Sequence, residues 1–380
     1  FLKDKHCYAA VNEMWTATAP AGRRDPWGKL LENMGWDIEQ LNDLFGEWAL
    51  HNITWDYQNP PPSEPSNQGP IYRDGYGPIT DTSRPERRRR ITTLEPLSAE
   101  TATDGRLAER RFVSPSSWAP QRWGYNVVRL YPEAGASSVK VTFRGVLQPD
   151  ADAGFRYGLV ATNAELSSAR YSQLGRGTEG ELDFCVSPGE SLWLVVTATP
   201  TRLQQIIWDQ PYPSIPRYPY LVQIDGAWPE GFRDGSPEAC AVGERHANGG
   251  GCAIASVPDS VYVGPFARVL GGNVSGTARI EDHAVILPGA TVSGGVVGAL
   301  SLLSRFTVSG SARVQTTFYP PGFFEAGQAL SGNARLYGDV EYRGPGLNRN
   351  AGEFFGYVDA ATQTSALADV TPPPPYAWRP

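Results

Sequence analysis

The sequence predicts a multidomain, mainly β protein: a short helical segment, then an antiparallel β-sandwich, then a left-handed parallel β-helix. Three observations lead to this prediction. Gly and Pro are both abundant, at 41 and 33 of 380 residues, which favours turn-rich β architecture. Apolar and polar residues alternate through the middle of the chain. A six-residue repeat then continues through residues 252–342.

Residues 1–57 are predicted to be helical. Gly35 is typical of a helix terminator, and Asp37 followed by Gln40 forms a capping-box pattern where the next helix begins. Apolar residues then recur at helical spacing and form one stripe: Leu41, Leu44, Phe45 and Trp48. Such a stripe needs a covering layer, and the pattern of the remaining sequence does not indicate one. The chain also starts without Met or a signal-like leader, so we interpret it as a trimmed fragment.

Residues 58–96 are rich in proline and predict an extended, partly ordered linker. Within it, the basic run at residues 87–90 is interpreted as a solvated entry into the first strand. A patch for polyanions and a dibasic processing site are the alternatives for this run.

Residues 97–230 show a period of two in short segments that are separated by turn signals, which predicts an antiparallel β-sandwich. In two of these segments the inward-facing residues are expected to be Val139, Val141, Phe143, Phe155, Tyr157, Leu159 and Ala161. The segment SLWLVVTAT is denser in apolar residues and predicts a more buried strand. We expect the aromatic residues to belong to the core, with stacking on sugar rings as the alternative.

A Gly-rich connector at 231–251 leads into the six-residue repeat. Three copies read VSGTARI, VSGSARV and LSGNARL. The large aliphatic or aromatic positions are Val257, Val263, Val269, Val274, Ile280, Ile286, Val292, Val308, Val314, Leu330, Leu336 and Tyr342. Four residues after most of them stands a small or β-branched residue: Val261, Ala267, Ala278, Ala284, Ala290, Ala312, Ala334 and Val340.

This period is typical of a triangular β-helix in which three hexads close one coil, and about five coils are expected. The aliphatic residue fills the interior, Ser-Gly lies at the turn, and Arg points to solvent. The segment 315–329 breaks the period and predicts a loop. The tail at 343–380 is expected to be extended, anchored by Tyr376 and Trp378.

The formal net charge of −7 argues against a general nucleic-acid binder, because a phosphate-binding surface needs clustered cations. No apolar run reaches the roughly 18 residues needed to span a bilayer, so no membrane span is expected.

Four cysteines occur, at positions 7, 185, 240 and 252. Cys240 and Cys252 bracket the loop CAVGERHANGGGC, and we expect a disulfide between them and a secreted, extracellular protein. Free thiols are the first alternative. A zinc site that includes His246 is the second, although two Cys and one His lack a fourth ligand.

The chain contains no Gly-x-Ser-x-Gly elbow, no His-Glu-x-x-His and no phosphate-binding loop. The one histidine within regular coils is His283, which we expect to be an exposed outward residue. The alternative is that His283 acts as the base of a hexapeptide-repeat acyltransferase, oriented by Glu281 or Asp282.

Three stretches carry a resemblance to a known family: the helical segment around GWDIEQLNDLFGEWALHNITWDY, then WAPQRWGYN, then RHANGGG with the coils that follow. The chain resembles the C-terminal two-thirds of the Svx/AvrXca-type secreted bacterial virulence or avirulence proteins. That family has a gluzincin-like zinc metallopeptidase domain. The resemblance covers nearly the whole chain.

The resemblance implies that residues 1–57 are the end of a peptidase domain whose zinc ligands lie upstream of Phe1, so that this chain itself holds no metal ligand. The sandwich and β-helix would be accessory domains for stability or for binding substrate or a surface, and the substrate would be a protein or peptide. A gluzincin subdomain of this kind often supplies a His or Tyr that stabilises the oxyanion. Tyr57 is the first candidate for that role, with His51 and His6 also available and structural packing as the alternative. The alternative function is a non-catalytic protein that binds cell-wall polysaccharide.

Overall fold

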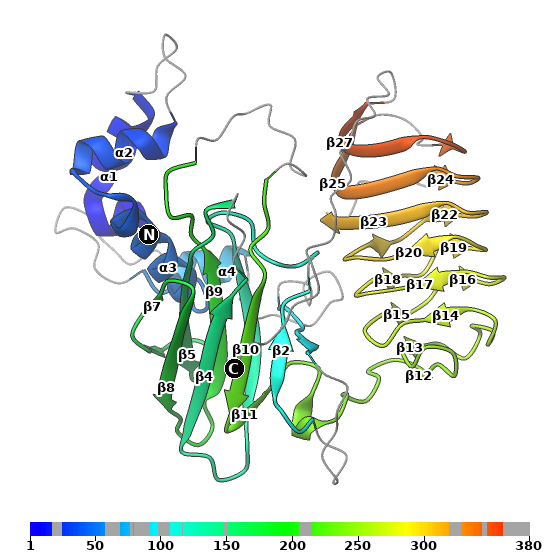
Figure 1. Cartoon of the computed structure of the whole chain (residues 1–380), viewed down its shortest axis with the longest axis horizontal. Coiled ribbons are helices and arrows are strands. Elements are labelled where there is room, and N and C mark those ends of the chain that lie inside the picture. Colours follow the sequence, from blue (N-terminus) through cyan, green and yellow to red (C-terminus); the bar gives the residue numbers. More distant parts are fainter. Residues whose placement is uncertain are drawn as a thin grey trace. The chain divides into compact units, whose positions relative to one another are not determined.

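The computed structural model describes residues 1–16, 25–57, 69–76, 79, 91–97, 107–115, 117–146, 151–204, 215–318, 328–343 and 348–359 (Figure 1). These residues form two compact units, a first that ends at Pro237 and a second that begins at Glu238. The basic run at 87–90, most of the loop at 315–329 and the tail anchors Tyr376 and Trp378 lie outside the described residues.

The first unit begins with the predicted helices, α1 (Leu2–Thr16), α2 (Pro26–Met34) and α3 (Ile38–His51). Helix α2 ends at Gly35, whose φ of 64° is the left-handed conformation that suits glycine. Helix α3 begins with a complete capping box, in which Asp37 accepts from the Gln40 amide and the Gln40 side chain accepts from the Asp37 amide. Both predicted helix boundaries are therefore confirmed. A further helix, α4 (Gly69–Tyr76), lies in the connector that was expected to be extended.

Two antiparallel sheets follow, as predicted. One sheet has the strand order β1 (Glu95–Pro96), β2 (Arg111–Val113), β10 (Tyr220–Asp225), β4 (Ser138–Gly145) and β8 (Glu179–Cys185). The other has the order β11 (Ala227–Pro229), β3 (Tyr125–Pro132), β9 (Ser191–Ala198), β5 (Phe155–Thr162) and β6 (Ala169–Tyr171), and β7 (Gly175–Arg176) also pairs with β5. We call the second one the β3–β5 sheet.

The core between the two sheets consists of the residues that the alternation predicted. Val139, Val141 and Phe143 of β4 are fully buried, and Phe143 stacks on Tyr157 of β5 with ring centroids 4.0 Å apart. Because aromatic side chains bury large areas and prefer offset or tilted contacts, these rings supply much of the apolar area of the sandwich.

Helix α3 covers the outer face of the β3–β5 sheet. Its Leu50 packs, with Ile53 just after the helix, into one cluster with Val127, Val160 and Trp193. The predicted stripe packs in a second cluster, in which Leu41, Leu44 and Phe45 meet residues of α1 and α2 and Trp123. Helix α3 therefore has covering partners in this chain that the sequence pattern did not indicate. Every residue of β5 is buried, because its second face lies under the helix.

Two glycines bring α3 close to the sheet. A Cβ on Gly46 would lie 2.6 Å from the Cβ of Arg156, and one on Gly158 would lie 2.9 Å from Cδ2 of Leu50. Arg156 is only 3% exposed, and its Nε and Nη2 donate to the carboxylates of Asp43 and Glu39, both at 2.6 Å. A buried guanidinium is tolerated only when it is paired, so these two acids fix the helix on the sheet.

The second unit is a parallel β-solenoid of three sheets. The first sheet contains β12 (Glu244–Arg245), which is antiparallel to its neighbour, and then β13 (Cys252–Ala253), β15 (Arg268–Val269), β18 (Val285–Ile286) and β21 (Leu302–Leu303). The second contains β14 (Tyr262–Val263), β17 (Arg279–Ile280), β20 (Val296–Val297), β23 (Arg313–Phe318), β25 (Arg335–Arg343) and β27 (Glu353–Asp359). The third contains β16 (Asn273–Val274), β19 (Thr291–Val292), β22 (Phe306–Val308), β24 (Gln328–Leu330) and β26 (Asn348–Arg349).

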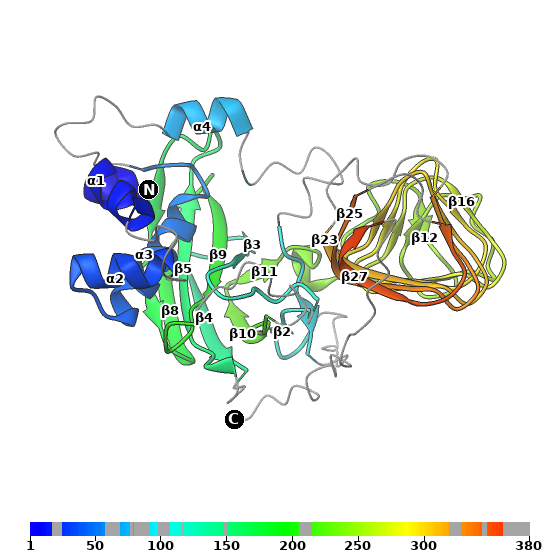
Figure 2. The ribbon, with the colours of Figure 1, turned by 90° about the horizontal axis from the view of Figure 1, so that it is seen from above.

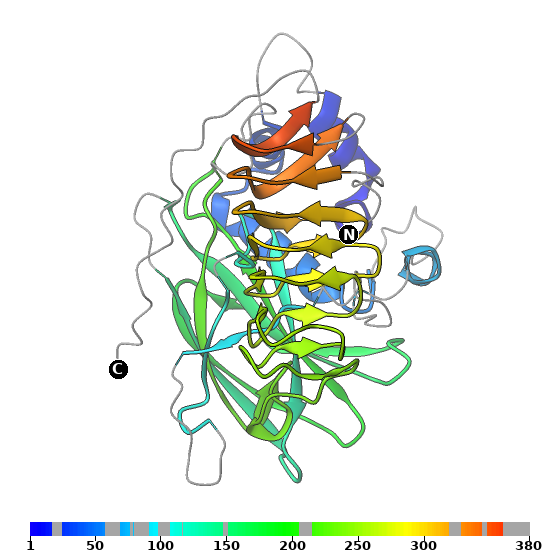
Figure 3. The same cartoon turned by 90° about the vertical axis from the view of Figure 1, so that its right-hand side faces the viewer.

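The coils have the triangular cross-section that the repeat predicted (Figure 2), and they stack as successive layers (Figure 3). Residues stack in register from Val263 to Ile280 to Val297 to Val314, each step being 17 residues. All four are fully buried. Val297 and Leu303 continue the interior through the stretch where the hexads were irregular, because five-residue steps from Val292 to Val297 and from Leu303 to Val308 replace six-residue steps there.

The repeated Ser-Gly pair has a steric reason. Gly276, Gly310 and Gly332 have φ values of 67°, 66° and 55°, in the left-handed region. A Cβ on Gly276 would lie 2.4 Å from the carbonyl oxygen of Ser293 in the next coil, and one on Gly332 would lie 2.3 Å from that of Asn350. The glycines therefore allow both the turn and the close stacking of coils.

Replacing Gly46 by Ala is expected to lower the free energy of unfolding of the first unit by about 1–3 kcal/mol, because the new methyl group overpacks the contact between α3 and β5. Chemical denaturation followed by circular dichroism measures the change. Gly75→Ala is the matched control: this glycine also lies in a helix, a Cβ added to it would meet no atom within 4 Å, and the substitution should gain up to about 1 kcal/mol from helix propensity. Equal effects of the two substitutions would contradict the steric argument.

Candidate functional site

His51, one of the two oxyanion candidates, is the last residue of α3. Its Nδ1 lies 2.6 Å from the backbone carbonyl oxygen of Asp56, and its ring packs on Tyr171 with centroids 4.3 Å apart. Burial lowers the pKa of His51 below its ordinary value. The imidazole is therefore neutral at pH 7 and held between the helix end and the sheet.

Tyr57, the other candidate, is 4% exposed. Its hydroxyl donates to Oδ1 of Asn52, and Nδ2 of Asn52 donates to the Tyr125 hydroxyl of β3 at 3.0 Å. The Tyr57 ring also contacts Tyr72 at a centroid distance of 5.7 Å. The structure thus brings Tyr57 and His51 together in a packed region below the end of α3, whereas His6 packs on Trp36. An oxyanion role for them stays a prediction.

Among the described residues, no three side chains of His, Cys, Asp or Glu are grouped so that they could hold a metal ion. Cys240 and Cys252 are joined in a disulfide, with Cα atoms 5.5 Å apart. The two cysteines of the alternative zinc site are therefore joined to each other and are not available as thiolate ligands. His246 is 8% exposed, and its Nδ1 accepts from the Asn248 amide at 3.3 Å.

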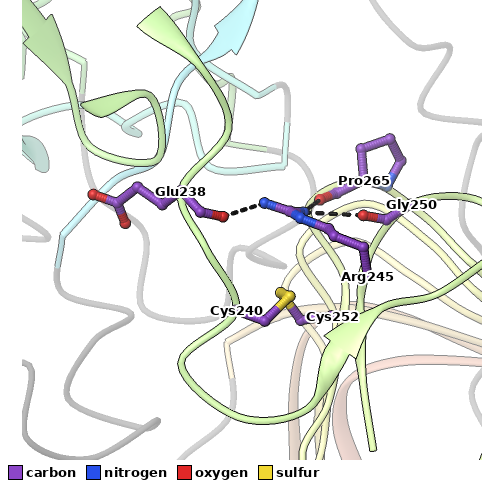
Figure 4. Close-up of a disulfide and its surroundings, with 6 residues drawn as sticks. All are labelled: Glu238, Cys240, Arg245, Gly250, Cys252 and Pro265. Carbon is purple, nitrogen blue, oxygen red and sulfur yellow. Dashed lines mark hydrogen bonds between the residues drawn. A yellow bond between two sulfur atoms is a disulfide. The ribbon is translucent and has the colours of Figure 1, made fainter. Parts of the chain in front are cut away.

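The disulfide belongs to a cap on the first coil of the solenoid (Figure 4). Arg245 of β12 donates to the carbonyl oxygens of Gly250 at 3.0 Å and Pro265 at 3.4 Å, and also to that of Glu238. One guanidinium with several N–H donors thus satisfies carbonyls that the end of a solenoid would otherwise expose. The cap closes the edge of the first sheet, which is the usual way that proteins protect a sheet edge.

His283 is 7% exposed and stacks on Phe266 with ring centroids 5.0 Å apart. The expectation of an exposed outward residue was wrong, because an aromatic ring from the preceding coil covers it. The adjacent carboxylates have other bonds: Asp282 accepts from the Ala299 amide at 2.7 Å, and Glu281 accepts from Arg279 at 2.6 Å.

A row of alternating cations and aromatic rings lies on the outer face of the β3–β5 sheet, beyond the part that α3 covers. Arg129 lies over the rings of Trp193 and Tyr131, at 5.4 and 4.9 Å from their centroids. Arg233, from the turn η3 (Arg233–Gly235), lies 4.4 Å from the Tyr131 centroid. We call these four residues, Trp193, Arg129, Tyr131 and Arg233, the arginine–aromatic ladder.

The sheet register explains the ladder. Arg129 of β3 is directly opposite Trp193 of β9, and Tyr131 follows on the same face two residues later. The strands can be followed in Figure 2. Trp193 is buried, Arg129 and Tyr131 are half-buried, and Arg233 is exposed. The ladder therefore rises from the covered part of the sheet toward solvent.

Neighbouring groups hold the ladder in place. The Tyr131 hydroxyl donates to the buried carboxylate of Glu230 at 2.7 Å, and the indole of Trp193 donates to Thr162 at 3.2 Å. Neither the Arg129 nor the Arg233 guanidinium has a hydrogen bond or ion pair with any residue in the described part of the chain. Each of them lies over one or two aromatic rings instead. This site was not predicted from the sequence, because only the alternation in VVRLYP pointed to Arg129 and Tyr131, and Arg233 joins them from a distant turn.

Residues 1–231 match the model of a protein family that is described as a family of unknown function, DUF6055. The match covers the helices and the sandwich but not the solenoid. No curated protein and no solved structure matches the chain. In the part of the chain that the structure describes, no helix has the length and apolarity needed to cross a membrane.

His51 should make stability depend on pH. The unfolded chain protonates this histidine with an ordinary pKa of about 6.5, whereas burial lowers the pKa in the folded chain. Below about pH 6.5 the unfolded state binds more protons, so this stabilising contribution is complete above that pH and is lost as the pH falls toward the folded pKa. Between about pH 7 and pH 5, the wild type should therefore lose more free energy of unfolding than His51→Gln. Chemical denaturation at both pH values measures this, and parallel losses would refute it.

Removing the disulfide with Cys240→Ser and Cys252→Ser should lower the stability of the first solenoid coil by about 2–4 kcal/mol, because the unfolded loop gains conformational freedom. Hydrogen exchange should show the loss first in β13 and β14. Cys185→Ser is the matched control, since Cys185 is a free, exposed cysteine in the sandwich. Unchanged protection of β13 without the disulfide would show that Arg245 and the glycines hold the cap alone.

Proposed function

The chain belongs to the DUF6055 family, and we propose that it is a secreted, non-catalytic protein that binds polysaccharide through the arginine–aromatic ladder. The solenoid, which follows this binding unit in the chain, serves as a rigid support. The disulfide between Cys240 and Cys252 supports an extracellular setting, because disulfides persist in oxidising compartments.

The observation that carries this proposal is the Tyr131 ring, which is partly exposed and has two guanidinium groups over it. Sugar rings present apolar C–H faces together with many hydroxyl groups. An aromatic ring can stack on the first, and guanidinium N–H groups can donate to the second. Tyr131 and Arg129 lie on a strand of a packed sheet, and a site on such an element keeps its geometry better than a site on a loop.

From the resemblance to the Svx/AvrXca-type proteins we further propose that this chain is the C-terminal part of a secreted bacterial zinc metallopeptidase. Such an enzyme would cleave protein or peptide substrates, with its zinc bound by residues outside this sequence. The family match and two of the resembling stretches fall in the same part of the chain, residues 1–231. A precursor sequence with His-Glu-x-x-His upstream would support this proposal, and an intact native protein that begins at Phe1 would count against it.

Replacing Tyr131 by Ala should weaken polysaccharide binding by at least about tenfold, which corresponds to about 1.4 kcal/mol, because the stacking surface is lost. Affinity electrophoresis against a panel of cell-wall polysaccharides measures the effect, and a chelator should not change it. Tyr8→Ala is the matched control: Tyr8 is 58% exposed and also has a cation over its ring, that of Lys3, but it lies on α1.

If the wild type binds polysaccharide and Tyr131→Ala binds it equally well, the binding site lies outside the ladder. Failure of the wild type to bind any polysaccharide of the panel would contradict the proposed function itself.

A further inference from the structure

Resting on the function proposed above, we propose that the ladder selects carboxylated polysaccharides, polymers of uronic acids, and that Arg129 and Arg233 bind their carboxylates. Both guanidinium groups lie over the Tyr131 ring. A cation–aromatic contact does not use the N–H groups of a guanidinium, so these remain available as hydrogen-bond donors. Carboxylates accept such donors in pairs, which gives strong and directional recognition.

A comparison with other arginines of this chain shows that the ladder arginines have aromatic partners but no carboxylate partner among the described residues. Three of them also lie over an aromatic ring, and each has a carboxylate partner as well. Arg110 lies over Trp228 and bonds Glu133 at 2.7 Å. Arg279 lies over Tyr262 and bonds Glu281 at 2.6 Å.

The third is Arg170, which lies over Phe184 and bonds Glu190 at 2.6 Å. In the ladder, by contrast, the described residues supply Arg129 and Arg233 with rings and with no carboxylate. A carboxylate from a ligand would complete the same arrangement at both positions.

Glu230, the acid that bonds to the ladder, has a different task. It is 4% exposed and accepts from the Tyr131 hydroxyl at 2.7 Å, so it fixes the position of the ring. Arg129 and Arg233 lie 4.9 and 4.4 Å from the same ring centroid. Carboxylates on neighbouring sugars of one polymer can therefore reach both arginines, whose positions the Tyr131 ring sets.

The chain as a whole carries a net charge of −7, which repels polyanions at long range. At physiological ionic strength such repulsion is screened beyond about 8 Å, so the local pair of arginines decides binding. The ligand must therefore present carboxylates that fit the ladder, since negative charge alone does not suffice.

The test compares polygalacturonate with its fully methyl-esterified form, which has the same sugar and linkage without the charge. The wild-type chain should bind polygalacturonate at least about tenfold more tightly, and added salt should reduce the difference. Arg129→Gln with Arg233→Gln should bring the two affinities within about twofold of each other. Arg279→Gln is the matched control, because that cation also lies over a tyrosine but already has its carboxylate.

The possible results distinguish failure of the carboxylate preference from failure of the proposed polysaccharide function. Equal binding of both polymers by the wild type would overturn the choice of carboxylates and leave the proposed polysaccharide function intact. Binding to neutral polysaccharides of the panel but not to polygalacturonate would overturn it in the same way. Binding to neither polymer nor to the panel would overturn the function as well. Arg233→Gln alone guards against misfolding, because Arg233 is exposed, and it should already reduce the preference by about threefold or more.

Discussion

The contact between helix α3 and strand β5 is the constraint on which the first unit depends. Arg156 is buried there and needs Asp43 and Glu39, and Gly46 lets the backbones approach closely enough for these bonds to form. Removing one partner of such a buried pair typically costs about 3–5 kcal/mol, because it leaves a charge uncompensated. This contact decides which part of the outer sheet face is covered. It places His51 at the covered edge and leaves Arg129 and Tyr131 open beyond it.

The two units use glycine for the same physical purpose in different folds. In the sandwich, Gly46 and Gly158 allow a helix to lie directly on a sheet. In the solenoid, Gly276 and Gly332 allow one coil to turn and to lie directly on the next. In each case a single methyl group would overlap backbone or packed side chains. The high glycine content is therefore a consequence of close approach between elements, in addition to being a sign of turns.

The features that could be predicted from the sequence are the ones that local chemistry determines. The end of α2 at Gly35, the capping box of Asp37 and Gln40, and the stacked coils all follow from patterns of a few residues. The covering of the sheet by α3 could not be predicted, because a strand that is buried on both faces looks the same whatever covers it. The burial of His283 under Phe266 depends on one coil stacking on another, and the ladder depends on Arg233, about a hundred residues after Arg129. Pairings of that kind are set by tertiary structure.

The central claim is that the helices are an integral layer of the sandwich and thereby define which part of the sheet face the ladder occupies. Native-state hydrogen exchange on the full chain tests it most directly, by comparing the amides of α3 with those of β5 and β9. If the claim holds, these amides exchange through one shared opening and have similar free energies of exchange, since the helix cannot leave without exposing the sheet face. Rapid exchange throughout α3 while β5 and β9 stay fully protected would contradict it.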